Sequence, residues 1–262
     1  MPMRFLLLAV FVLLAGQVQA LQCTAHSAKT TTALVELYTS EGCDSCPPAD
    51  RWLSTLGARG YAPDRVVPIA LHVDYWDYIG WKDPYAKQVF SARQRKMASL
   101  ARAAVVYTPQ VLLQGRDFRG WREGGNPSAF EQELAKINAR PAMARISLRL
   151  NTRPGNAFEV ETAAELESAL PAQNMVLYLG AYENKLLSEV KAGENRGKTL
   201  PHDFVVLQWT GPLEFQGAKL AARQTLPLLP NAIPAHSGVV AFVQNRSTGE
   251  VLQALMLPVC PG

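Results

Sequence analysis

The chain has 262 residues, of which 48% are hydrophobic, so it is long enough to bury a sizeable core and too apolar to be disordered. Its formal net charge of +4 comes from Lys and Arg residues scattered along the sequence, without a dense basic run interleaved with aromatic residues. The distribution of charge is therefore not that of a typical nucleic-acid-binding protein, and we expect no nucleic-acid partner.

The first 20 residues have the three parts of a secretory signal peptide. Arg4 is followed by an apolar run over residues 5–16 and by a small-x-small cleavage sequence that ends at Ala20. We therefore expect residues 1–20 to be removed and the mature chain to be exported, either to a periplasm or into the medium. The apolar run is shorter than the ~20 residues that span a bilayer, and no later run is long enough, so we expect no integral membrane segment after signal removal.

A Cys-x-x-Cys sequence formed by Cys43 and Cys46 lies between a predicted strand and a predicted helix. Residues 33–38 are apolar and β-prone, which predicts a strand that ends before Gly42. Two prolines follow Cys46 and suit the first turn of a helix, which is expected to run from residue 47 to about 58. The cysteines are thus expected at a helix N-terminus, where the helix dipole favours a thiolate on Cys43.

This spacing is suited to thiol–disulfide exchange. Cys43 would form a mixed disulfide with a partner, and Cys46 would resolve it. The same two residues also fit an inert structural disulfide or half of a zinc site, although zinc would need distant ligands, because no second Cys-x-x-Cys exists. We therefore expect no metal and no cofactor other than the redox-active disulfide itself.

The two remaining cysteines, Cys23 and Cys260, lie beside the two ends of the chain. In an oxidising compartment, a bridge between them would tie both ends to the folded body. Their positions make them a candidate structural disulfide, but the sequence alone leaves the connectivity open.

A second strand is expected over residues 65–73, and polar residues follow it. A histidine and two carboxylates, His72, Asp74 and Asp77, lie just past the strand end, where open α/β sheets place their ligands. They could bind a metal, but both aspartates equally suit turn and helix-start positions, and we favour structural roles.

Two further helices are expected, one from Asp83 to about Arg102 and one ending at Asn138. Between them, Thr108 and Pro109 lead into a β-prone run that ends at Gly115. A proline there is typical of a strand start or of a cis turn.

The order of these elements resembles the thioredoxin-like fold over residues 33 to about 139. More closely, the sequences Gly-Cys-Asp-Ser-Cys-Pro-Pro-Ala-Asp at 42–50, His-Val-Asp-Tyr-Trp-Asp at 72–77 and Tyr-Thr-Pro-Gln at 107–110 resemble a family of secreted bacterial thioredoxin-like proteins of unknown function. The resemblance implies that Thr108 and Pro109 form a cis-proline loop that faces the cysteines, and it implies no substrate.

The resemblance also draws attention to Glu36, which lies near the position where thioredoxins carry a buried acid that relays a proton to the resolving cysteine. If Glu36 points inward, it would serve Cys46 as a proton acceptor, and if the other strand face is buried, it is merely solvated. Two departures from ordinary thioredoxins are Gly42 in place of an aromatic residue and Asp44-Ser45 in place of Gly-Pro. The Asp44 charge opposes a thiolate on Cys43, which would make the protein a weaker oxidant than oxidases with strongly acidic thiols.

From about residue 144 onward the pattern changes to alternating and β-prone runs. Strands are expected at 145–150, 158–161, 175–182, 202–209, 218–226, 238–244 and 251–257. Two histidines in this half, His202 beside Asp203 and His236, could take part in acid–base pairs, but no serine in a Gly-x-Ser-x-Gly turn accompanies them, so a hydrolase is a distant interpretation.

The predicted fold is therefore α/β: a thioredoxin-like domain over residues 21–142, followed by a smaller, mostly antiparallel β domain over 143–262. The expected function is that of an exported thiol–disulfide oxidoreductase. Its partners would be a protein or small-molecule thiol or disulfide and a second redox partner. The alternative is a non-catalytic thioredoxin-like binding or metal-delivery protein with a structural disulfide.

Overall fold

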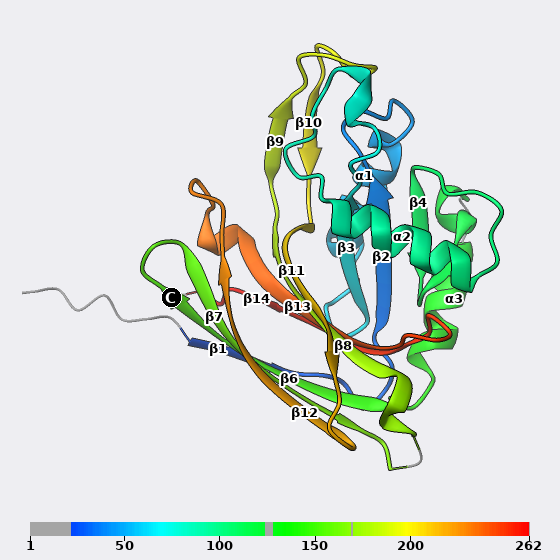
Figure 1. The fold of residues 1–262 in the computed structure, drawn as a ribbon, viewed down its shortest axis with the longest axis vertical. Helices are drawn as coiled ribbons and strands as arrows, with labels where there is room; N and C mark the ends of the chain where they lie inside the picture. The colour runs from blue at the N-terminus through cyan, green and yellow to red at the C-terminus, as the bar shows by residue number, and fades with distance from the viewer. Residues whose placement is uncertain (1–21, 124–127, 169, 262) are drawn as a thin grey trace, which may run out of the picture.

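The computed structural model describes residues 22–123, 128–168 and 170–261. The expected signal peptide and the expected mature N-terminus at Leu21 lie outside these residues. Figure 1 shows a large twisted sheet with helices on both faces, a second sheet packed against one end of it, and a long hairpin beside α1. None of the helices in the described ranges is long and apolar enough to cross a membrane.

The large sheet has eight strands, and its central strands run in parallel. β2 pairs with β3 in parallel along its whole length, β11 joins β3 in parallel, and all other neighbours are antiparallel. In spatial order the strands are β14 (Val251–Pro258), β13 (Ser237–Asn245), β8 (Met175–Glu183), β11 (Val205–Glu214), β3 (Val66–His72), β2 (Ala33–Thr39), β4 (Gln110–Leu113) and β5 (Arg116–Asp117).

The predicted fold class, a thioredoxin-like α/β domain followed by a small β domain, is wrong. The molecule is mostly β-sheet, and four strands from the second half of the chain extend the same sheet that carries β2, β3 and β4. The junction is narrow, because β11 meets β3 at a single register pair, Val205 with Ala70. Pro68 lies two residues earlier in β3 and has no amide hydrogen to donate, which accounts for the short ladder.

Within the described residues, three α-helices cover the large sheet. They are α1 (Pro47–Ala58), which has the predicted bounds, α2 (Gln88–Leu100), which begins later than Asp83, and α3 (Ala129–Asn138), which is capped by Ser128. α1 and α3 contribute Leu53 and Phe130 to one core, whereas α2 contributes Phe90 to a core on the opposite face. Single 3-10 turns connect other elements: η1 (Asp77–Ile79), η2 (Arg119–Arg122), η3 (Ala172–Asn174) and η4 (Pro234–His236).

A four-stranded antiparallel sheet packs against the part of the large sheet that the second half of the chain forms. Its order is β1 (Gln22–His26), β6 (Ala144–Arg153), β7 (Ala157–Leu166) and β12 (Lys219–Pro227). β6 alternates buried and exposed positions, as expected for a strand with one face in a core. Leu148 and Leu150 of β6 share one hydrophobic core with Leu177 and Leu179 of β8.

The third sheet is the two-stranded hairpin of β9 (Leu186–Glu189) and β10 (Thr199–His202). The predicted strand at 202–209 is divided in the structure, because Phe204 adopts a φ of 57° between β10 and β11. The hairpin therefore leaves the large sheet and lies against α1 (Figure 1), which places the loop between its strands near the cysteines.

Candidate functional site

Cys43 and Cys46 form a disulfide at the N-terminus of α1. β2 ends at Thr39, a tight turn brings the chain to Cys43, and Cys46 is the residue that caps the helix. The amides of Ala49 and Asp50 donate to the Cys46 carbonyl, so the first helical turn closes directly behind the disulfide. Pro47 and Pro48 have no amide hydrogen, so it is the dipole of this helix end that favours negative charge on a sulfur atom released there.

The disulfide is fully buried, whereas the two residues between the cysteines, Asp44 and Ser45, are exposed. Asn195, in the loop of the β9–β10 hairpin, covers the pair: its side-chain amide donates to the carbonyl oxygens of Glu41 (2.8 Å) and Cys43 (2.9 Å). The backbone amide of Asp44 donates to Glu194 of the same loop. Both cysteines are buried in this conformation, and this loop is bonded to the turn that carries them.

Thr108 and Pro109 lie at the same edge of the sheet as the cysteines. Tyr38 of β2 is in register with Gln110 of β4, so the residues just before β4 lie opposite the end of β2. The Thr108–Pro109 peptide bond is cis. The Thr108 hydroxyl accepts a hydrogen bond of 2.7 Å from the indole of Trp76.

Trp76 also limits the size of the residue that can stand before the first cysteine. A Cβ atom added at Gly42 would lie 3.0 Å from the Trp76 Cβ and 3.4 Å from Ile79. The absence of the aromatic residue common in thioredoxins at this position thus has a local cause, because Trp76 already occupies the space beside the turn.

Glu36 is buried, but it does not face the cysteines. It lies on the face of β2 that packs against α2, where Arg93 donates to it over 2.7 Å and the Tyr38 hydroxyl donates over 3.0 Å. The residues on either side, Val35 and Leu37, point into the core shared with α1. The geometry therefore gives Glu36 an ion-pair partner on the opposite face of the sheet from Cys46.

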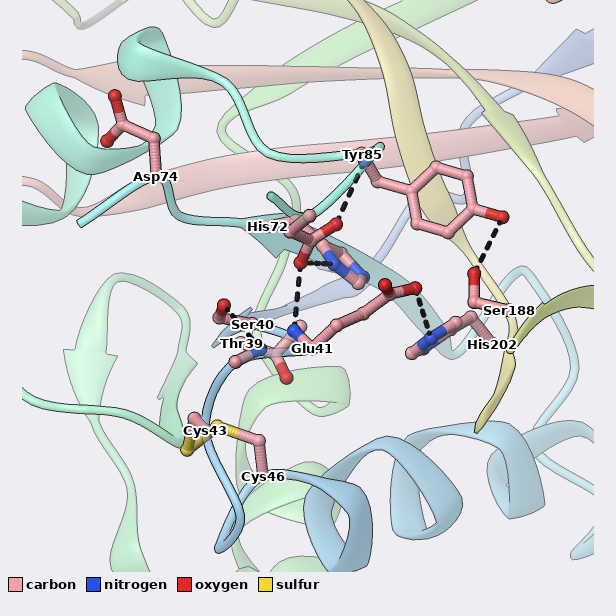
Figure 2. A network of polar contacts seen from close by, with 12 residues as sticks. Thr39, Ser40, Glu41, Cys43, Cys46, His72, Asp74, Tyr85, Ser188 and His202 are labelled. Atoms are coloured by element: carbon pink, nitrogen blue, oxygen red, sulfur yellow. Dashed lines mark hydrogen bonds and ion pairs between the residues drawn. A yellow bond between two sulfur atoms is a disulfide. The ribbon is translucent and has the colours of Figure 1, made fainter. Parts of the chain in front are cut away.

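A second polar cluster lies behind the disulfide, and Figure 2 shows several of its members. His72, the last residue of β3, contacts Asp83 through Nδ1 and Oδ2 at 2.7 Å. His202, the last residue of β10, contacts Glu41 through Nε2 and Oε1 at 3.1 Å. Asp50, on the first turn of α1, accepts a hydrogen bond from Thr39. All five ionisable side chains are buried.

The carboxylates and imidazoles of this cluster perturb one another. Burial alone would lower the pKa of His72, but Asp83, together with Asp50 and Glu41, raises this pKa above its ordinary value. Burial would raise the pKa of Asp83, yet His72 holds it below the ordinary value. Burial raises the pKa of Asp50, and this effect is larger than the opposing effects of His202 and His72.

One donor atom each of Asp50, His72 and His202 lies within 4.8 Å of the other two, close enough for all three to bind a single metal ion. Asp74 and Asp77, for which we favoured structural roles over a metal group with His72, accept hydrogen bonds from Ser91 and from the backbone of Asp83 respectively.

Sequence reasoning missed the contributions of Asp50, Glu41 and Asp83 to this cluster. Of these three residues, only Asp50 could have been placed near the cysteines from the sequence. It lies four residues after Cys46, which is about one helical turn further on. His202 was considered only beside Asp203, which instead accepts a hydrogen bond from the backbone of Lys185.

The candidate disulfide between Cys23 and Cys260, whose pairing the sequence left open, is present. It joins β1, at the edge of the four-stranded sheet, to the segment after β14, at the end of the eight-stranded sheet. Disulfides of this kind persist mainly in proteins outside the reducing cytosol.

Fold and site together define a mostly β protein with a covered Cys-x-x-Cys disulfide at a helix N-terminus. The chain belongs to the family described as "Protein of unknown function (DUF1223)", whose model matches residues 34–244. No curated protein matches the sequence significantly.

Two solved structures have a similar fold. A structural-genomics protein of Agrobacterium tumefaciens superposes with a TM-score of 0.62 at 22% identity, covering 90% of this chain and 98% of that one. HBP35 of Porphyromonas gingivalis superposes with a TM-score of 0.63 at 14% identity, covering 89% of this chain and 76% of that one. At these identities the similarity shows the fold alone.

Proposed function

We propose that the protein is an exported thiol–disulfide oxidoreductase whose reactive group is Cys43–Cys46. The observation that carries the proposal is the position of this disulfide at the N-terminus of α1, where a released thiolate is stabilised. The second disulfide, between Cys23 and Cys260, supports an oxidising and therefore extracytoplasmic location, periplasmic or secreted.

When the pair reduces a partner disulfide, Cys43 attacks it and Cys46 resolves the mixed disulfide. In the oxidising direction, a thiolate of a partner dithiol attacks the Cys43 sulfur, and Cys46 leaves as a thiolate. The partner's second thiolate then attacks the mixed disulfide and releases Cys43. The partner is oxidised to a disulfide, and the cysteine pair is reduced to a dithiol by the same two electrons. A redox partner that carries a disulfide accepts these electrons and restores Cys43–Cys46.

We propose that the substrate docks beside the cysteines, at the end of the sheet where β2 stops and β4 begins. Thr108 and Pro109 lie there, with Trp76 hydrogen-bonded to Thr108. The partner would dock at this end of the sheet after the Asn195 loop has moved away from the Glu41 and Cys43 carbonyls.

The test is the equilibrium reduction potential of Cys43–Cys46 in redox buffers, with thiol trapping and identification of the labelled peptides by mass spectrometry. A potential within the range of known exchange proteins, about −270 to −120 mV, is expected. The Cys23–Cys260 disulfide is an internal control that should stay oxidised over this range. A Cys43–Cys46 potential well below about −300 mV would mean that this disulfide is structural and would contradict the proposal.

Full burial of both cysteines favours the competing function, a binding protein in which this disulfide is structural. Turnover separates the two functions. An oxidoreductase should oxidise a reduced, unfolded substrate protein repeatedly in glutathione buffer, and Cys43→Ser should abolish this. A protein with a structural disulfide should give no turnover before or after the substitution.

A further inference from the structure

The buried cluster behind the disulfide brings together donor groups from three distant parts of the chain. Asp50 comes from α1, His72 from the end of β3 and His202 from the end of β10. Within residues 22–123, 128–168 and 170–261, they are the one group of three or more His, Cys, Asp or Glu side chains with this mutual proximity. Because these three residues are far apart in sequence, they come together only when the whole chain has folded.

Each imidazole in the cluster has one nitrogen in contact with a carboxylate and one nitrogen without a partner. The occupied atoms are Nδ1 of His72, held by Asp83, and Nε2 of His202, held by Glu41. The second nitrogens, Nε2 of His72 and Nδ1 of His202, are buried and make no hydrogen bond. Carboxylate–histidine pairs of this type orient the imidazole and fix its tautomer when the other nitrogen binds a metal.

The two rings are arranged so that they could share one ion. Their centroids are 5.0 Å apart and their planes are inclined by 79°, so they do not stack on each other. Figure 2 shows both histidines between the sheet and the cysteine-bearing turn. Thr39 donates to Oδ2 of Asp50 and thereby orients the third donor.

The charge of the cluster also favours a cation. Glu41, Asp50 and Asp83 are each at most 7% exposed. Across the described residues, no Lys or Arg forms an ion pair with any of the three. Buried carboxylates are costly unless positive charge compensates them, and here that charge can come from protonated imidazoles or from a bound divalent cation.

We propose that Asp50, His72 and His202 bind one divalent transition-metal ion, with Glu41 and Asp83 as positioning residues for the two histidines. Two imidazole nitrogens and one carboxylate oxygen form a ligand set that suits Zn²⁺ and other borderline first-row ions better than Mg²⁺ or Ca²⁺. Three protein ligands leave a coordination position for water or another ligand.

Such an ion would link the hairpin to the helix that carries the cysteines. His202 is the last residue of the hairpin, and the Asp50 amide donates to the Cys46 carbonyl. Metal binding would therefore hold β10, β3 and the first turn of α1 together. The ligand set does not include the sulfur atoms, so metal binding and disulfide exchange can be tested separately.

The first experiment measures metal in the oxidised protein, whose four cysteines are all in disulfides and are not available as ligands. The mature chain is expressed without a histidine tag in zinc-supplemented medium, and its metal content is determined by elemental analysis after gel filtration. Zn²⁺ affinity is then measured after chelator treatment. We expect one Zn²⁺ per chain and a higher thermal midpoint with the metal than without it.

Matched variants assign the ligands. Asp50→Asn and His202→Ala should each weaken Zn²⁺ binding by at least 100-fold, and Asp83→Asn should weaken it by 10- to 100-fold through loss of the His72 orientation. His26→Ala and His236→Ala replace the two histidines outside the cluster and should leave both stoichiometry and affinity unchanged. Equal loss in these controls would overturn the assignment.

The unsubstituted protein provides a measurement that does not depend on whether the variants fold. Its Co²⁺ complex should show the visible d–d absorption of a low-symmetry site with nitrogen and oxygen ligands, and Zn²⁺ should displace the ion. Absence of stoichiometric Zn²⁺ in the purified protein, together with absence of Co²⁺ absorption after incubation, would overturn the proposal. Either result leaves the reduction potential of Cys43–Cys46 as a separate test of the proposed function.

Discussion

At the scale of single residues, Arg93 and Glu36 form the central buried ion pair of the α2 face. Besides Glu36, Arg93 donates to Gln244 over 3.0 Å, and its guanidinium lies 4.8 Å from the ring centre of Tyr178 and 5.0 Å from that of Phe242. Burial, and then the nearby Glu36 charge, raise the pKa of Tyr38 well above its ordinary value, so its hydroxyl remains a donor to Glu36.

Replacing Arg93 tests the structural role that this geometry gives to Glu36. Arg93→Met should lower the free energy of unfolding by about 3–5 kcal/mol, because it leaves the Glu36 carboxylate buried without its cation. Urea denaturation followed by tryptophan fluorescence measures the change. Lys96→Met, on the exposed side of the same helix, should change stability by no more than about 0.5 kcal/mol.

A double substitution separates loss of charge pairing from loss of packing. Glu36→Gln combined with Arg93→Met removes both charges and should recover part of the stability lost in the single variant. If Arg93→Met alone cost less than about 1 kcal/mol, or if the double variant were less stable than the single one, the ion pair would not have the importance given to it here.

The residues that the sequence could identify are those whose chemistry depends on neighbours along the chain. Cys43 and Cys46 are three positions apart, and the following prolines locate the helix end, so their arrangement follows from local rules. His202 is 152 residues after Asp50, and no spacing rule connects them. Glu36 shows the related limit for strands, because a fully buried strand has no polar face in its sequence, and its inward direction therefore depends on which helix packs on which side.

At the scale of elements, the β9–β10 hairpin is bonded to the turn that carries the disulfide, and we expect it to limit access to the sulfur atoms. Its loop contributes Asn195, which is fully buried and bridges two carbonyl oxygens of the cysteine-bearing turn. Gly193 of the same loop has a φ of 70° and lies against Ile79 and Trp81, so the loop also packs on the segment after β3. The hairpin thus connects the turn to its surroundings through both polar and apolar contacts.

Removing the Asn195 side chain should make the disulfide easier to reach. Asn195→Ala loses two hydrogen bonds to the turn, each worth about 0.5–1.5 kcal/mol, so the rate at which dithiothreitol reduces Cys43–Cys46 should rise about ten-fold or more. Rapid thiol trapping measures this rate. Arg196→Ala alters the exposed neighbour in the same loop and should leave the rate unchanged. Equal rates for all three proteins would mean that the hairpin does not limit access.

At the scale of the whole molecule, the sequence predicts most of the individual strands but not their partners. Alternation in β6 and continuous apolar runs in β8 and β13 indicate strands correctly, since these patterns depend on burial alone. Strands with these patterns could form a separate small domain or extend an existing sheet. The choice depends on contacts between distant parts of the chain, among them the register pair of Val205 with Ala70 and the core that Leu34 shares with Phe242.

The two sheets are also joined covalently, which leads to a prediction about global stability. Cys23 and Cys260 are 237 residues apart in sequence, so their disulfide closes nearly the whole described chain into a loop. In the chain-entropy relation a loop of this size stabilises the folded state by about 5 kcal/mol, against about 2 kcal/mol for the three-residue separation of Cys43 and Cys46. The bridge also holds β1, which among the described strands pairs with β6 alone, against the end of β14.

The double variant Cys23→Ser/Cys260→Ser should therefore lose about 3–5 kcal/mol of unfolding free energy, measured by urea denaturation under non-reducing conditions. Cys43→Ser/Cys46→Ser is the matched control, because it also removes one disulfide and two sulfur atoms, and it should lose less. A smaller loss in the first variant than in the control would show that the long loop contributes little constraint to the unfolded chain. The two sheets would then be held together by their shared core of leucine and valine side chains rather than by the bridge.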